Sequence, residues 1–111
     1  MALDRFTVID LLPFYEVLLT ERQKEIMKSY FFDDLSLSEI AENLQISRNA
    51  VYDTVKKTEK TIFDYEEKLH LYDNAMFRME IYDKLKTDLN REDKLSLIEK
   101  LIAKEEEYQY E

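Results

Sequence analysis

Residues 48 to 60 carry side chains whose types and spacing suit contact with nucleic acid. An arginine guanidinium can pair with guanine edges and an asparagine amide with adenine edges in a major groove, whereas lysine ammonium groups suit phosphates. An aspartate among them either accepts a hydrogen bond from a cytosine amino group or repels phosphate. We therefore predict a nucleic-acid-binding surface made of Arg48, Asn49, Tyr52, Asp53, Lys56, Lys57 and Lys60.

These side chains can face a nucleic acid only if the opposite face of their helix is packed against the rest of the protein. Val51 and Val55 lie four positions apart, which places both on one face of a helix and the predicted binding residues on the other. The preceding run, Leu37 to Leu44, has its own apolar face, with the small Ala41 where two helices must cross closely. With Ile46 as the aliphatic anchor of the turn between them, this spacing predicts a helix-turn-helix.

Three N-terminal caps predict where the helices of this unit begin. Thr20–Gln23 and Ser36–Glu39 each have the pattern of a capping box, and Ser47 caps the helix that follows the turn. Unpaired NH groups near Ser36 and Ser47 could add phosphate contacts, so both serines join the predicted binding residues. At Gln45, where many such turns have glycine, a left-handed backbone would cost on the order of 1 kcal/mol.

Apolar spacing predicts further helices on both sides of this unit. The apolar N-terminus is interrupted by acidic residues, which favours a core helix over a signal peptide. From Arg48 onward apolar or semi-apolar residues recur every three or four positions up to Tyr72, which predicts one unusually long helix running into a helical C-terminal half. Asn90, three residues before Asp93, predicts the start of a last helix.

The composition favours an all-α fold. The chain of 111 residues has no glycine and one proline, whereas average usage of about 7% would give roughly eight glycines. Tight hairpins and phosphate-binding loops need residues that adopt positive φ at low cost. The absence of glycine therefore argues against sheets, P-loops and dinucleotide folds.

The residue types that serve catalysis and metal binding are scarce. The sequence has no cysteine and a single histidine, His70, so we predict no disulfide, no metal site and no cofactor. Its 25 acidic residues fall at helical spacings beside lysine and arginine, as they do on solvated faces, and we do not expect an enzyme. No apolar run reaches the roughly 20 residues that span a bilayer, which predicts a soluble protein without membrane contact.

The net charge of −9 is unevenly distributed along the chain. Residues 61 to 111 carry −6, residues 36 to 60 are balanced, and residues 47 to 60 hold four basic side chains against two acidic ones. Binding to nucleic acid depends chiefly on local neutralisation of phosphates. A small basic patch on an acidic protein therefore predicts weak binding that falls steeply with salt.

Two longer patterns resemble known bacterial families. The segment LTERQKEIMKSYFFDDLSLSEIAENLQISRNAVYDTVKK resembles region four of bacterial sigma factors, the helix-turn-helix that reads the upstream promoter element. The wider pattern, FYEVLLTERQKEIMKSYFFDDLSLSEIA followed by ISRNAVYDTVKKTEKTIFDYEEKLHLYDN, is more specifically similar to the YlxM family of small helix-turn-helix proteins of Gram-positive bacteria. This similarity spans most of residues 12 to 89.

The resemblance implies a fold, a place and a role. The fold is a sigma region-four-like helix-turn-helix, unrelated to winged helices, whose recognition helix begins at Arg48. The place is the cytoplasm, and the gene of such a protein lies beside those for the signal recognition particle and its receptor. The implied role is a regulatory protein of that targeting pathway which contacts nucleic acid, with DNA favoured over RNA. The alternative is a protein-interaction module whose acidic C-terminal half binds a component of the particle, with the helix-turn-helix retained as scaffold.

We expect one domain over residues 1–111, because no glycine- or proline-rich linker divides the chain. It comprises a trihelical unit at 20–60 and a helical extension at 61–111. The extension is rich in apolar and aromatic residues but has few other elements to pack against, which predicts a homodimer through residues 60 to 90. The predicted interface residues are Ile62, Tyr65, Leu69, Tyr72, Phe77, Ile81 and Leu85.

Overall fold

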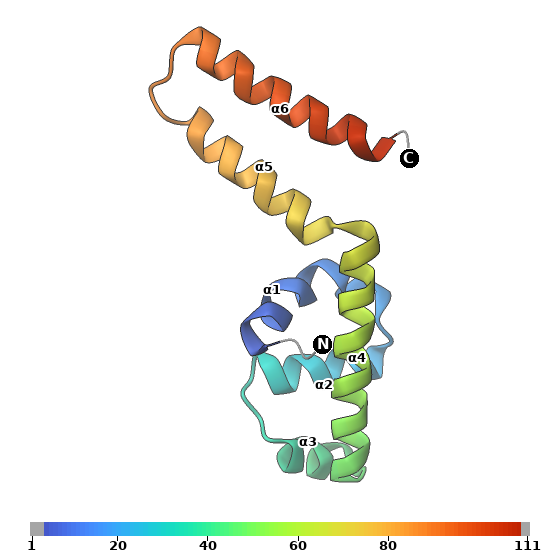
Figure 1. The fold of residues 1–111 in the computed structure, drawn as a ribbon. Coiled ribbons are helices and arrows are strands. Elements are labelled where there is room, and N and C mark those ends of the chain that lie inside the picture. Colours follow the sequence, from blue (N-terminus) through green and yellow to red (C-terminus); the bar gives the residue numbers. More distant parts are fainter. Residues whose placement is uncertain (1–3, 110–111) are drawn as a thin grey trace. The chain divides into compact units, whose positions relative to one another are not determined.

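The computed structural model describes residues 4–109, and every regular element in that range is a helix (Figure 1). The all-α prediction is therefore confirmed. A short 3₁₀ turn, Glu16–Leu18, follows the first helix. The α-helices are α1 (Arg5–Tyr15), α2 (Glu21–Phe31), α3 (Leu37–Leu44), α4 (Arg48–Leu69), α5 (Leu71–Leu85) and α6 (Arg91–Gln109).

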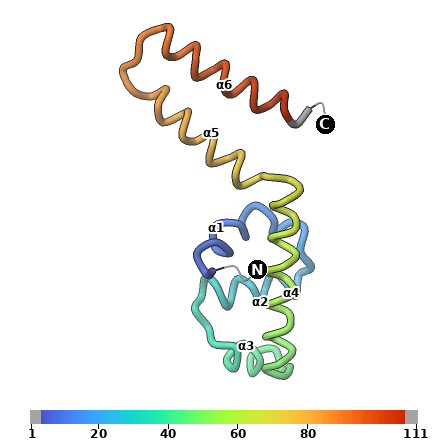
Figure 2. Tube along the Cα trace, in the orientation of Figure 1, coloured from blue at the N-terminus to red at the C-terminus, as the bar shows by residue number. Residues whose placement is uncertain are grey.

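The chain divides into two compact units, with the boundary between Tyr72 and Asp73. As the apolar spacing predicts, α4 runs from the trihelical unit into the extension without a break at residues 60 and 61 (Figure 2). Whether residues 1–111 act as a single domain stays a prediction.

The core of the first unit forms around α4, which contacts α1, α2 and α3. Helix α4 presents an apolar stripe at helical spacing, and each of the three other helices covers part of it (Figure 1). One buried cluster therefore joins all four helices. Its most deeply buried members are Val8, Leu12, Tyr15, Ile26, Met27, Ile40, Val51 and Ile62.

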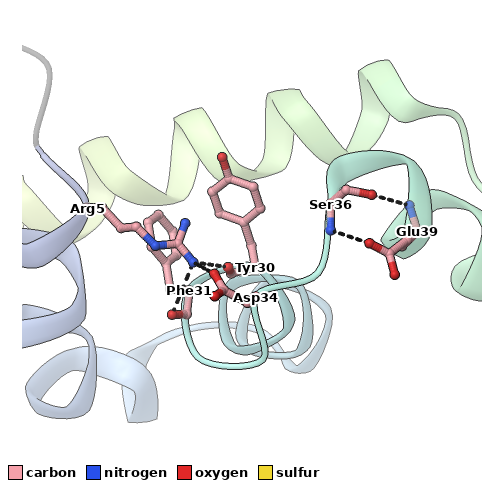
Figure 3. Close-up of polar contacts among 6 residues, drawn as sticks. All are labelled: Arg5, Tyr30, Phe31, Asp34, Ser36 and Glu39. Atoms are coloured by element: carbon pink, nitrogen blue, oxygen red, sulfur yellow. Dashed lines mark hydrogen bonds and ion pairs between the residues drawn. The ribbon is translucent and has the colours of Figure 1, made fainter.

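The predicted caps all form. Both capping boxes are complete, and in the second the Ser36 hydroxyl accepts from the Glu39 NH while the Glu39 carboxylate accepts from the Ser36 NH, each at 3.0 Å (Figure 3). The Ser47 hydroxyl accepts from the Ala50 NH at 3.0 Å, and Asn90 caps α6. These bonds satisfy NH groups that the first turn of a helix leaves unpaired.

Arg5 fixes the link between α2 and α3. Its guanidinium donates to the Tyr30 carbonyl oxygen at 2.7 Å and to the Asp34 carboxylate at 2.6 Å (Figure 3). It also lies over the rings of Tyr30 and Phe31. A carbonyl at the end of α2 thus receives a donor from α1, which holds the start of the helix-turn-helix against the rest of the unit.

The long helix ends earlier than its apolar pattern suggests. His70 has φ 55° and ψ 31°, a left-handed conformation that stops α4 at Leu69, so Tyr72 belongs to α5. The backbone NH of Leu71 donates to the Tyr15 hydroxyl at 3.2 Å, and that of Tyr72 donates to the Glu66 carboxylate at 3.0 Å. Tyr15 of α1 and Glu66 of α4 therefore cap α5, where no capping signal was predicted.

Two of the seven predicted dimer-interface residues, Ile62 and Ile81, are buried inside the units. Ile62 is fully buried in the core of the first unit, so its assignment to a dimer interface is wrong. Tyr65 and Tyr72 pack against the same core, and Ile81 is buried in the second unit. Helices α1, α2 and α3 pack against the apolar stripe of α4 and bury it. The sequence pattern alone could not show this packing.

The remaining predicted interface positions are Leu69, Phe77 and Leu85. Leu69 is exposed, while Phe77 and Leu85 are half-buried. Phe77 lies under the ammonium group of Lys104, whose Nζ is 5.7 Å from the ring centroid. Phe77 is thus already covered in part by α6 within the second unit.

Candidate nucleic-acid interface

The turn between α3 and α4 is closed by backbone hydrogen bonds around a left-handed residue. Gln45 has φ 56° and ψ 44°, as expected for the position where glycine is common. The Ile46 NH donates to the Ala41 carbonyl at 3.1 Å, and the Gln45 NH donates to the Glu42 carbonyl at 3.3 Å. This pair is a Schellman motif. It ends α3 tightly and sets the angle at which α4 leaves the turn.

Two valines orient the first turns of α4. Val51 is 0% and Val55 is 3% exposed, and α3 packs against this side with the buried Ile40 and Ala41. Successive helix positions turn by about 100°, so burial of one stripe directs the opposite half outward. All nine predicted nucleic-acid-binding residues are exposed: Ser36, Ser47, Arg48, Asn49, Tyr52, Asp53, Lys56, Lys57 and Lys60.

The exposed side chains of α4 differ in how strongly the protein itself holds them. Lys56 pairs with Glu59 at 3.6 Å and lies over the Tyr52 ring, 5.7 Å from its centroid. Lys60 pairs with Asp64 at 3.2 Å. Both lysines are exposed, and ion pairs at a protein surface are worth only about a fraction of a kcal/mol, so phosphate can displace them. Glu59 entered the predicted charge balance of this segment but not the predicted binding residues, although its spacing of three from Lys56 signals the pair.

Arg48 and Lys57 are the least constrained cations of this surface. Within residues 4–109 neither takes part in an ion pair. Both are exposed, Arg48 at the first position of α4 and Lys57 further along the helix. They can turn toward a bound phosphate or base without breaking an existing contact.

The two capped N-termini are not equivalent. At α3 the Glu39 carboxylate occupies the capping box, and an acidic group there repels phosphate. At α4 no acidic residue lies in the first turn, and the Ser47 hydroxyl accepts from the Ala50 NH. The N-terminus of α4 is therefore the better site for a phosphate, and it lies beside Arg48.

The described part of the chain was also compared with the requirements of a metal site and of a membrane-spanning helix. No three His, Cys, Asp or Glu side chains gather there in a way that could hold a metal ion. His70 ends α4 with its left-handed backbone. None of the described helices is long and apolar enough to cross a membrane.

The sequence is similar to bacterial proteins of one family. The profile of the family described as "Putative helix-turn-helix protein, YlxM / p13 like" matches residues 3–104. A UPF0122 protein of Bacillus velezensis is 45% identical over 108 residues, covering 94% of this chain and 98% of its own. One from Oceanobacillus iheyensis is 48% identical over 85 residues, or 76% of this chain and 81% of its own.

A UPF0122 protein of Streptococcus suis is 49% identical over 75 residues, and the match covers 68% of this chain but only 66% of that relative. The profile match includes the whole of the helix-turn-helix described above and most of the second unit. The chain therefore belongs to the YlxM/p13-like family of helix-turn-helix proteins.

Proposed function

We propose that this protein binds nucleic acid, DNA in preference to RNA, through the exposed half of α4. The observation that carries the proposal is the orientation of this helix: Val51 and Val55 are buried while Arg48, Asn49 and Lys56 all face solvent. Arginine and asparagine are the side chains that read guanine and adenine edges. A helix that leaves a Schellman turn with these residues outward has the form of a recognition helix.

We further propose that the protein acts in the cytoplasm as a regulator of the signal recognition particle pathway. Its membership of the YlxM/p13-like family supports this role, through the gene neighbourhood that the resemblance implies. The basic patch is small and the chain carries a net charge of −9. Binding of modest strength suits a regulator that must release its target readily.

The test is the affinity of the full chain for fluorescently labelled DNA duplexes at low salt, measured by anisotropy. Replacing Arg48→Ala together with Lys56→Ala removes one predicted base contact and one phosphate contact, and we expect binding to weaken roughly tenfold or more. The matched control is Arg78→Ala with Lys86→Ala, which removes the same residue types from exposed positions of the second unit. The control is expected to bind like the parent.

If both double variants weakened binding equally, the binding surface would lie elsewhere, or the affinity would depend only on the net charge of the chain. An unchanged affinity of the Arg48/Lys56 variant would refute the proposed surface outright. The same series with RNA of matching sequence tests the preference, since tighter binding to RNA than to DNA would reverse it.

A second candidate function is binding to a basic partner protein through the acidic C-terminal half. The observation that favours it is the net charge of −6 over residues 61–111, with Glu105, Glu106 and Glu107 all exposed. The partner to test is the protein subunit of the signal recognition particle. If this function holds, Glu106→Gln with Glu107→Gln weakens binding of the purified subunit, and the Arg48/Lys56 variant binds it normally.

A further inference from the structure

Helix α6 has an exposed apolar stripe on a side that α5 does not cover. Leu95 is 47%, Ile98 41% and Ile102 51% exposed. Their spacing of three and four places them on one face, whereas Leu97 and Leu101, which lie to one side of this stripe, are half-buried. Three large aliphatic side chains in a row are more than the scattered exposure that a solvated helix normally shows.

The same stripe continues at both ends into opposite charges. Four positions before Leu95 is Arg91, and three positions after Ile102 is Glu105, and both are exposed. Ile98 lies midway between these two charges in the sequence. Along the helix the stripe therefore has a cation at one end, three aliphatic residues in the middle and an anion at the other end. At a rise of 1.5 Å per residue it is about 20 Å long.

We propose that α6 pairs with α6 of a second copy of this chain, antiparallel, about a twofold axis near Ile98. In that arrangement Arg91 of each copy meets Glu105 of the other, and Leu95 meets Ile102. The contact is isologous, because the same patch serves both partners. Antiparallel helices also oppose their macrodipoles favourably.

Charge selects the antiparallel arrangement over the parallel one. A parallel pair would place Arg91 against Arg91 and Glu105 against Glu105 within the stripe itself. It would gain a contact between Lys94 of one copy and Glu99 of the other, but only at the border of the stripe, where an exposed ion pair contributes little. The antiparallel form replaces these two like-charge contacts with two Arg91–Glu105 pairs at the ends of the stripe, and this difference favours it.

The surface suits a weak dimer. A stable interface buries about 1,600 Å² in total, more than one helix stripe provides. In the antiparallel pair Glu92, Glu99 and Glu106 of each copy also line one border, which brings like charges together. We expect a dissociation constant on the order of tens of micromolar.

The absence of cysteine from the sequence makes the orientation directly measurable. One full-length chain carries Arg91→Cys and another, of distinguishable mass, carries Glu105→Cys, and a short bismaleimide is added to the mixture. The antiparallel pair predicts the mixed product. Cross-links of each variant with itself, without the mixed product, would show a parallel pair and overturn the proposal.

Sedimentation equilibrium of the full chain provides the second measurement. Arg91→Glu is expected to raise the dissociation constant about tenfold, and the double variant Arg91→Glu with Glu105→Arg to restore it, because the exchanged charges meet again. Circular dichroism checks that α6 remains helical in each variant. A parent chain that stays monomeric to several hundred micromolar, or a double variant no tighter than the single one, contradicts the pairing. DNA binding by α4 is not required for either result.

Discussion

At the scale of single residues, Tyr15 makes the most consequential polar contacts of the first unit. The side chain is fully buried, and its hydroxyl donates to the Glu66 carboxylate at 2.5 Å while accepting from the Leu71 NH. Burial, and next the hydrogen bond to Glu66, raise the pKa of Tyr15 to about 12. The neutral hydroxyl is therefore the form that the folded protein requires.

This raised pKa predicts how stability changes in alkali. Below pH 10 the tyrosine is neutral in both folded and unfolded chains, and its contribution to stability is complete. Between about pH 10 and 12 the unfolded chain loses the proton that the folded chain keeps, so the free energy of unfolding falls, by on the order of 2 kcal/mol. Denaturant unfolding at several pH values measures this fall.

Tyr15→Phe is expected to be less stable at pH 7, because Glu66 and the Leu71 NH lose a partner, but to show a shallower fall above pH 10. Tyr52→Phe removes a hydroxyl from an exposed side chain and controls for the loss of one tyrosine. An unchanged slope in Tyr15→Phe would mean that another group causes the alkaline loss.

At the scale of elements, the turn of the helix-turn-helix shows how far local pattern determines geometry. The aliphatic spacing and the caps on α3 and α4 are properties of neighbouring residues, and they predicted both helices and the anchor Ile46. The Schellman closure then follows, because α3 can end tightly only if the next residue is left-handed. Without glycine in the chain, Gln45 takes that conformation at a cost.

Gln45→Gly is therefore expected to stabilise the protein, by about 0.5–1 kcal/mol after the greater freedom of glycine in the unfolded chain is subtracted. Thermal or urea unfolding measures the change. Gln45→Ala keeps the β-carbon and is the matched control, for which we expect no gain. A gain of equal size in both variants would show that the glutamine side chain, rather than its backbone, destabilises the turn.

At the scale of the whole chain, a basic surface on α4 attracts phosphate while the net charge of −9 repels it. Four cations on that surface, Arg48, Lys56, Lys57 and Lys60, are exposed, and the proposed function has them contact phosphates. Since each neutralised phosphate contributes about −0.9 to the slope of log affinity against log salt, three or four contacts predict a slope of roughly −3.

Anisotropy titrations at several salt concentrations measure this slope. We expect Lys57→Ala to reduce its magnitude by about one while weakening binding to all sequences alike. A slope near zero would mean that phosphates are not bound. A slope two or three times steeper would require basic residues outside α4.

Local sequence determined much of this protein. The absence of glycine, the three caps and the apolar spacing lie within a few residues of what they control, so they predicted an all-helical chain, the starts of α2, α3 and α4, and the outward face of α4. The Asn90 cap of α6 was predictable for the same reason.

Only the tertiary structure decided the features that join distant residues. The bond from Tyr15 to Glu66 spans 51 positions, and the break at His70 is capped by these same residues, so an uninterrupted apolar period concealed it. Likewise an apolar residue such as Ile62 has the same pattern whether it faces a core or a partner. Which of these it faces depends on whether other helices of the same chain reach it, and α4 is already covered by three of them.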